Sequence, residues 1–95
     1  MSAYRLFEDP GHAWLEVPRA EVVASGAKIS GYSYCDPLTD MAYLEEDSDA
    51  PAFLAAVGLD WRTLPFEMVY SSMPRQLPAY DPAATTQHRA QGYER

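Results

Sequence analysis

The sequence predicts a single α+β domain, in which a mostly antiparallel sheet carries two short helices in the order ββαββαβ. Short alternating runs, segments with helix start and stop signals, and turn residues between them support this class. The 95 residues, 47% of them hydrophobic, are enough for one core but not for two. We assign residues 1–71 to the domain and residues 72–95, which contain three prolines, to an irregular C-terminal tail.

Five segments have strand character. The runs 4–7 and 12–17 flank Asp9-Pro10-Gly11, a turn triplet, and form a predicted hairpin. A second hairpin is predicted from the run 29–35 and the run that resumes at Met41, separated by the turn residues 36–40. In the run 29–35, alternation places Tyr32 and Tyr34 on one face. Residues 66–70 form the last predicted strand.

Two segments have helix signals. The first runs from Pro18, which suits a first helical position, to Ser25 before Gly26, and its predicted inward stripe is Ala20, Val23 and Ala24. The second begins with Asp49 as predicted N-cap and ends at Gly58. Its helical spacing predicts that Phe53, Leu54 and Val57 face the core.

The net charge of −7 is unevenly distributed. No basic residue lies between Lys28 and Arg62, whereas 7 of the 14 acidic residues fall in that interval. Such a balance argues against direct binding of nucleic acid or of an anionic membrane, because both need positive potential. A partner protein with a basic surface is expected instead, while a solvated acidic edge would need no partner.

Seven tyrosines and two tryptophans also exceed what a small core needs, and both residue types suit protein interfaces. Trp14 and the tyrosines of the second hairpin are the interface candidates, although they would equally serve as core. Glu45, Glu46 and Asp47 have no structural task that the sequence reveals. The predicted partner-binding residues are therefore Tyr32, Tyr34, Asp36, Asp40, Tyr43, Glu45, Glu46 and Asp47.

The sequence gives less support to a catalytic site or a metal site. The acids Glu45, Glu46, Asp47 and Asp49 lack the central glycine and the later glutamate of a calcium loop. His12, His88 and Cys35 are too few for a closed zinc site. We expect no metal, no cofactor and no catalytic residue. The alternatives are a small enzyme or metal-dependent hydrolase that uses Cys35, His12 or the acidic cluster, and an assembly protein that self-associates through a hairpin edge.

The segments 7–18 (FEDPGHAWLEVP), 29–34 (ISGYSY) and 42–50 (AYLEEDSDA) resemble a family of small acidic proteins of bacteriophages and other mobile elements. The resemblance covers roughly residues 4–57. It implies a context and assigns no residue a role: proteins of this kind often bind host machinery, and some are anti-CRISPR inhibitors that block nucleic-acid channels. The expected function is thus a non-enzymatic inhibitor of a host defence or nucleic-acid-processing protein.

The single cysteine excludes an internal disulfide and is typical of a reducing compartment. The N-terminal residues turn acidic before any apolar run, and no run approaches the length of a membrane span. We therefore expect the protein in the cytoplasm of the host cell.

Overall fold

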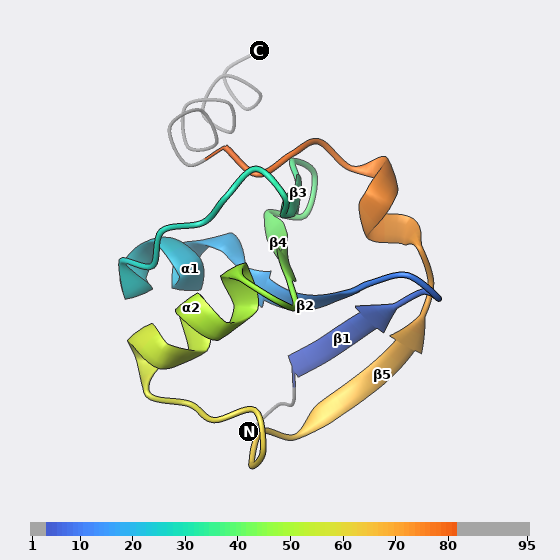
Figure 1. The fold of residues 1–95 in the computed structure, drawn as a ribbon. Helices are drawn as coiled ribbons and strands as arrows, with labels where there is room; N and C mark the ends of the chain where they lie inside the picture. The colour runs from blue at the N-terminus through green and yellow to red at the C-terminus, as the bar shows by residue number, and fades with distance from the viewer. Residues whose placement is uncertain (1–3, 82–95) are drawn as a thin grey trace.

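The computed structural model describes residues 4–81. They form a five-stranded mixed sheet with two helices, which confirms the predicted α+β class. The elements in chain order are β1 (Tyr4–Glu8), β2 (Ala13–Pro18), α1 (Arg19–Ser25), β3 (Tyr34–Asp36), β4 (Met41–Glu45), α2 (Asp49–Val57), β5 (Phe66–Tyr70) and the 3-10 helix η1 (Met73–Gln76). The strand order across the sheet is β3-β4-β2-β1-β5 (Figure 1).

Most of the sheet is antiparallel, and its one parallel pair joins the first strand to the last. β2 pairs antiparallel with both β1 and β4, and β4 pairs antiparallel with β3. After β4 the chain crosses through α2 to the opposite edge of the sheet, where β5 runs parallel to β1 with Tyr4 beside Phe66. A parallel neighbour requires such a crossover, which the helix provides.

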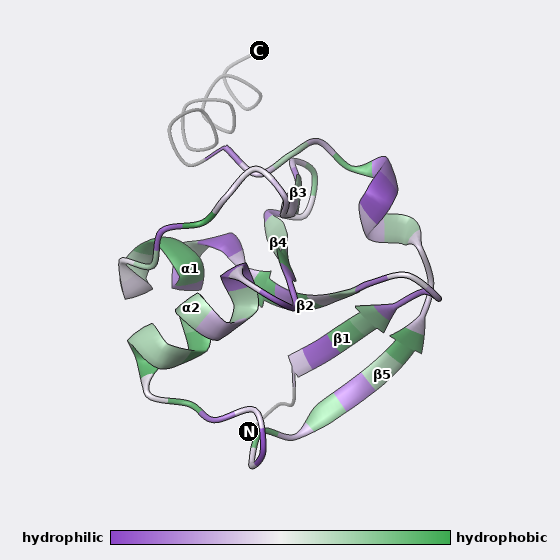
Figure 2. Ribbon diagram, viewed as in Figure 1, coloured by the Kyte–Doolittle hydropathy of each residue, from purple (hydrophilic) through white to green (hydrophobic). Residues whose placement is uncertain are grey.

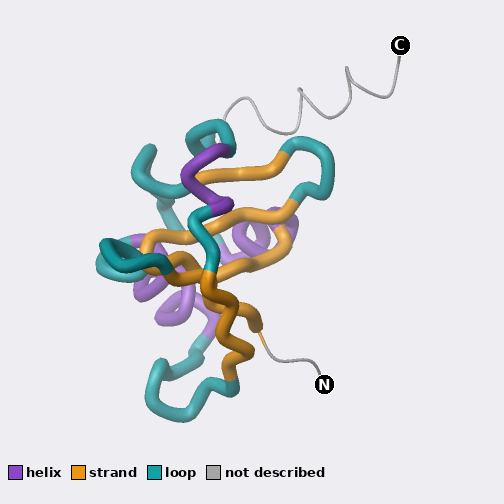
Figure 3. Tube along the Cα trace, turned by 90° about the vertical axis from the view of Figure 1, so that its right-hand side faces the viewer, coloured by secondary structure: helices purple, strands orange, loops and turns teal. Residues whose placement is uncertain are grey.

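The helices cover one face of the sheet (Figure 2). Their buried side chains form the larger core with that face. Leu15, Leu44, Phe53 and Leu54 are the large buried side chains at its centre. The opposite face has a smaller core of Phe7, Trp14 and Tyr43, on which residues after β5 pack. Figure 3 shows η1 in front of the strands and the helices behind them, so the sheet lies between two layers.

Residues 72–81, which the sequence assigns to the tail, contact the sheet. Pro74 and Tyr80 are buried. The Cys35 amide donates to the Pro78 carbonyl (3.0 Å), and the Tyr80 amide donates to the Ser33 carbonyl (2.8 Å). This segment therefore covers the outer edge of β3. The remainder of the predicted tail lies outside the described residues.

Both helices lie close to their predicted ranges, but the faces they bury differ in part. In α1 the buried residues are Arg19 and Val22, so the predicted stripe of Ala20, Val23 and Ala24 is wrong. Arg19 is drawn inward because its guanidinium pairs with Asp40 (3.0 Å) and its amide bonds to the Asp40 carbonyl. This contact fixes the rotation of the helix.

In α2, Phe53 and Leu54 are buried as predicted, whereas Val57 is exposed. The helix ends at Gly58, whose φ of 76° lies in the left-handed region that favours glycine. Asp49 does not cap the helix. The N-cap position is Ser48, and Asp49 is the first helical residue, with a buried carboxylate.

The predicted strand 29–35 is reduced to residues 34–36. Its first part is irregular because Asp49 binds it: the carboxylate accepts from the Ser30 amide and from the hydroxyls of Ser30 and Ser33. Tyr32 then lies in an exposed turn instead of on a strand face, and Tyr34 is half-buried.

Candidate partner-binding groove

Three loops converge on one end of the smaller core. They are the turn before β2, the turn before β3 and the segment after β4, which the register of the strands brings together: Trp14 lies opposite Glu45, and Tyr34 lies opposite Tyr43. A hollow of about 360 Å³ forms there, which we call the groove. Its lining residues are His12, Trp14, Tyr32, Tyr34, Glu45, Asp47, Ser48 and Arg75.

Aromatic rings form the floor of the groove. The Trp14 ring is almost completely buried, with the Tyr34 ring edge-on at 6.2 Å and the His12 ring at 6.1 Å between centroids. The Arg75 guanidinium lies 5.1 Å from the centre of the Trp14 ring, within the range of a cation–π contact. Tyr32 stands at the rim with 77% of its surface exposed. The aromatic surface left open to a partner is therefore mainly that of Tyr32, together with parts of His12 and Tyr34.

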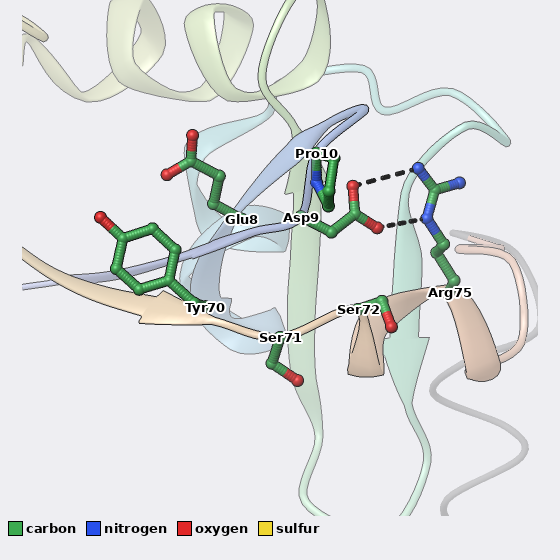
Figure 4. Close-up of a pocket in the computed structure, with 7 residues that line it drawn as sticks. All are labelled: Glu8, Asp9, Pro10, Tyr70, Ser71, Ser72 and Arg75. Atoms are coloured by element: carbon green, nitrogen blue, oxygen red, sulfur yellow. Dashed lines mark hydrogen bonds and ion pairs between the residues drawn. The ribbon is translucent and has the colours of Figure 1, made fainter.

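Arg75 is held in place by the turn between β1 and β2 (Figure 4). Asp9 accepts two bonds from the guanidinium, at 2.6 and 3.3 Å, and two from the amides of Gly11 and His12. The Arg75 guanidinium holds the pKa of the Asp9 carboxyl well below its usual range. Because this ion pair largely offsets the charge of Arg75, the cation does not cancel the acidity of the groove.

On the other side of Arg75 lies a second, more open hollow. Its lining includes Glu8, Pro10, Tyr70 and Ser71, which Figure 4 shows around the Asp9–Arg75 pair. Besides the Asp9–Arg75 pair, the polar side chains of this hollow are Glu8, Tyr70, Ser71 and Ser72, and none of them is a predicted partner-binding residue. We regard the groove as the candidate site because predicted partner-binding residues line it.

Acidic side chains form one wall of the groove, and they differ in their freedom. One Glu45 carboxylate oxygen accepts from the amides of Asp47 and Ser48 and from the Ser48 hydroxyl, at 2.9 to 3.0 Å. Glu45 thus holds the loop that begins α2, a structural task that the sequence does not reveal. Asp47 is exposed, so its carboxylate is available to a partner. Burial, followed by the nearby charges of Asp47 and Glu45, raises the pKa of Glu46.

Four predicted partner-binding residues line the groove: Tyr32, Tyr34, Glu45 and Asp47. The other four do not. Tyr43 is buried, and its hydroxyl donates to Glu16 at 2.8 Å. Asp40 pairs with the buried Arg19, and Glu46 does not line the groove.

The last of these, Asp36, accepts from the Leu38 amide in the turn between β3 and β4. The sequence groups these four side chains with the others because they are acidic or aromatic and lie on the second hairpin or the corner after it, and it does not reveal where the fold places each of them.

Sequence reasoning missed Arg75 and Ser48. Arg75 lies 66 positions from Asp9, in a segment that the proline content assigns to an irregular tail, so no local pattern signals the contact. Ser48 precedes a helix and could have been noted as a cap candidate. Trp14 and His12 were considered, the former as an interface residue and the latter as a possible base.

The residues of the proposed thiol site are not brought together. Cys35 belongs to the larger core, and its burial raises the pKa of the thiol to about 11, which disfavours the reactive thiolate. His12 lines the groove beside Trp14, on the opposite face of the sheet. Among residues 4–81, no group of three or more His, Cys, Asp or Glu side chains is arranged to hold a metal ion.

Within the described part of the chain, no helix has the length and apolar character needed to cross a membrane. Comparisons of the chain with protein-family models, with characterised proteins and with solved structures find no match.

Proposed function

We propose that this protein is a non-enzymatic binding protein whose groove accepts a cationic side chain from a basic surface of a partner protein. The observation that carries the proposal is that an exposed tyrosine, Tyr32, and an exposed carboxylate, Asp47, line one groove with an aromatic floor. Arginine and lysine side chains combine a charge that pairs with a carboxylate and a body that packs on an aromatic ring.

The size of the groove supports a single long side chain. Its volume of about 360 Å³ is at the lower end of the range for ligand pockets. The Arg75 guanidinium already stacks on the Trp14 ring, so the groove contains one arginine–aromatic contact of the kind proposed for the partner. A partner arginine would contact the remaining open rings and Asp47.

The partner class follows from charge. A chain of net charge −7 is attracted to proteins with positive surfaces, and those that process nucleic acids have them for their own ligand. An inhibitor of a host defence protein, of the phage type that the segments 7–18, 29–34 and 42–50 resemble, would occupy such a surface and would act in the host cytoplasm.

A titration with hexa-arginine, followed by NMR, tests the chemistry. We expect the largest shifts at the Tyr32 and Asp47 amides and at the Trp14 indole, and weaker binding as salt is added. Hexa-citrulline, which has the same length but no charge, should not bind. Tyr32→Ala should weaken binding about fivefold, which corresponds to a cation–π contact of about 1 kcal/mol. Asp47→Lys should weaken it further.

Matched controls lie on β5: Tyr70→Ala removes an equally exposed tyrosine and Glu67→Lys reverses an exposed acid. They should bind hexa-arginine within about twofold of the parent chain. Equal losses in the groove variants and the controls would show that only overall charge matters, and would overturn the proposal. So would shifts that map away from the groove.

A further inference from the structure

The two edges of the sheet differ in whether another segment pairs with them. At the β3 edge, residues 78–80 supply backbone partners, with Ala79 bridging to Tyr34. At the other edge, no strand among the described residues pairs with the outer side of β5. Protein sheets guard open edges with charged side chains, above all lysine, with proline or with a bulge. The sequence of β5, FEMVY, contains one charge, Glu67, and neither lysine nor proline, and all five of its residues pair in unbroken register with β1.

The backbone groups that β5 directs outward can be identified. The Ser71 amide donates to the Glu8 carbonyl at 3.0 Å, so Ser71 points its polar groups toward β1. In a parallel pair, alternate residues direct both N–H and C=O to the same neighbour. Val69 and Glu67 therefore also face β1, whereas Phe66, Met68 and Tyr70 point their N–H and C=O groups away from the sheet.

The side chains of those same residues are apolar or aromatic and partly exposed. Met68 exposes 42% of its surface and Tyr70 exposes 80%. Phe66 contacts Trp61, with ring centroids 5.1 Å apart. All three lie on the face of the sheet that carries the helices, beside Tyr4, Leu6 and Glu8 of β1. The helices leave this outer part of the face uncovered (Figure 1).

A second copy of β5 complements this edge in one register. Two β5 strands can pair antiparallel about a two-fold axis in any register that sets outward-pointing residues opposite one another, and only the register centred on Met68 uses the full strand. Met68 then pairs with Met68 of the second copy, and Phe66 pairs with its Tyr70.

The charges agree with this register. Glu67, the only charged residue of β5, falls opposite Val69 of the second copy, so the two carboxylates are not directly opposed. Any other occupant would need a strand with its own matching pattern.

We propose that β5 pairs with β5 of a second copy of this chain, forming a two-fold dimer whose sheet continues through both molecules. The interface consists of the outward N–H and C=O groups of Phe66, Met68 and Tyr70, with aromatic pairs of Phe66 and Tyr70 beside a central pair of methionines. None of the groove residues lies on β5, so the dimer does not depend on the proposed function.

Sedimentation equilibrium of the full chain tests the dimer. We expect a transition from 10.6 kDa to twice that mass between about 10 µM and about 1 mM. Met68→Lys places two like charges at the two-fold axis and should weaken the dimer at least about tenfold. Val23→Lys, which changes an exposed apolar residue on α1, should leave it unchanged, as should Met68→Leu. A mass of one chain at all concentrations would overturn the proposal.

Amide hydrogen exchange of the unmodified chain tests the register without any variant. The amides of Phe66, Met68 and Tyr70 should exchange quickly in dilute solution and slowly at high concentration. Those of Glu67 and Val69, which bond to β1, should be protected at both concentrations. Exchange at all five positions that is independent of concentration would contradict pairing through this edge.

Discussion

Single buried carboxylates organise much of the irregular structure. Asp49 accepts bonds from Ser30 and Ser33 and so joins the start of α2 to the segment before β3. Glu16, on the opposite face, accepts from the Arg5 guanidinium at 2.7 and 2.8 Å and from the Tyr43 hydroxyl. Asp49 takes the place of backbone pairing between its two segments, whereas Glu16 adds side-chain bonds between strands whose backbones already pair.

Asp49→Ala should destabilise the fold by about 2–3 kcal/mol, because it leaves the Ser30 amide and two hydroxyls without their acceptor. Asp49→Asn, which keeps the shape but has a single acceptor oxygen, should cost less. Urea unfolding measures both. Ser48→Ala is the control: its hydroxyl forms no capping bond, and the bond that it donates to Glu45 is exposed, so its cost should stay near 0.5 kcal/mol or below. Equal costs for Asp49→Ala and Ser48→Ala would show that Asp49 contributes only as a helix-terminal charge.

These residue roles could be predicted only in part. Phe53 and Leu54 follow from helical spacing, and the Asp9 turn follows from local turn chemistry. The roles of Asp49, Glu45 and Arg75 depend on partners brought close by the fold. A carboxylate before a helix is typical of a cap, and the sequence contains no signal that distinguishes a cap from a buried anchor.

At the scale of elements, the segment after η1 completes the sheet. Residues 77–80 follow the β3 edge, Tyr80 is buried against the larger core, and burial is the main cause of the raised pKa of its hydroxyl. The contacts link positions more than forty residues apart along the chain. For that reason, a composition rich in proline predicts an irregular tail but does not show where it packs.

Tyr80→Ala should lower the free energy of unfolding by about 3 kcal/mol, the usual cost of removing a large buried aromatic side chain. Tyr32→Ala removes the same group from an exposed turn and should change it by less than about 0.5 kcal/mol. Thermal or urea unfolding of the two variants provides the comparison. If Tyr80→Ala changed the free energy of unfolding only slightly, the stably folded domain would comprise only residues before Ser72.

The element order was predictable because hairpin turns, helix caps and strand alternation are local signals. The parallel placement of β5 beside β1 was not, since a last strand of this pattern could pair at either edge. The predicted strand 29–35 is longer than β3 because alternation alone does not reveal the bonds that Asp49 accepts from Ser30 and Ser33.

For the whole molecule, the net charge of −7 favours the proposed binding of a basic partner and opposes the proposed dimer. Binding of a basic partner is an attraction, so added salt should weaken it. Pairing of two like-charged copies includes a repulsion, so added salt should strengthen the dimer. We expect the hexa-arginine Kd to rise and the dimer Kd to fall between about 50 mM and about 500 mM NaCl. If both Kd values changed in the same direction as salt is added, charge would not control one of the two associations.

The pairing of β1 with β5 also has a consequence for the order in which the chain folds as it leaves the ribosome. The strands β1 to β4 and their helices can meet once residue 57 has emerged, but β1 must then wait with one side open until residues 66–70 follow. The β3 side is closed later still, by residues 77–80. During synthesis β1 and β3 therefore each have an open side, and the time before β5 and residues 77–80 cover them is when neighbouring nascent chains on the same messenger RNA are most able to join.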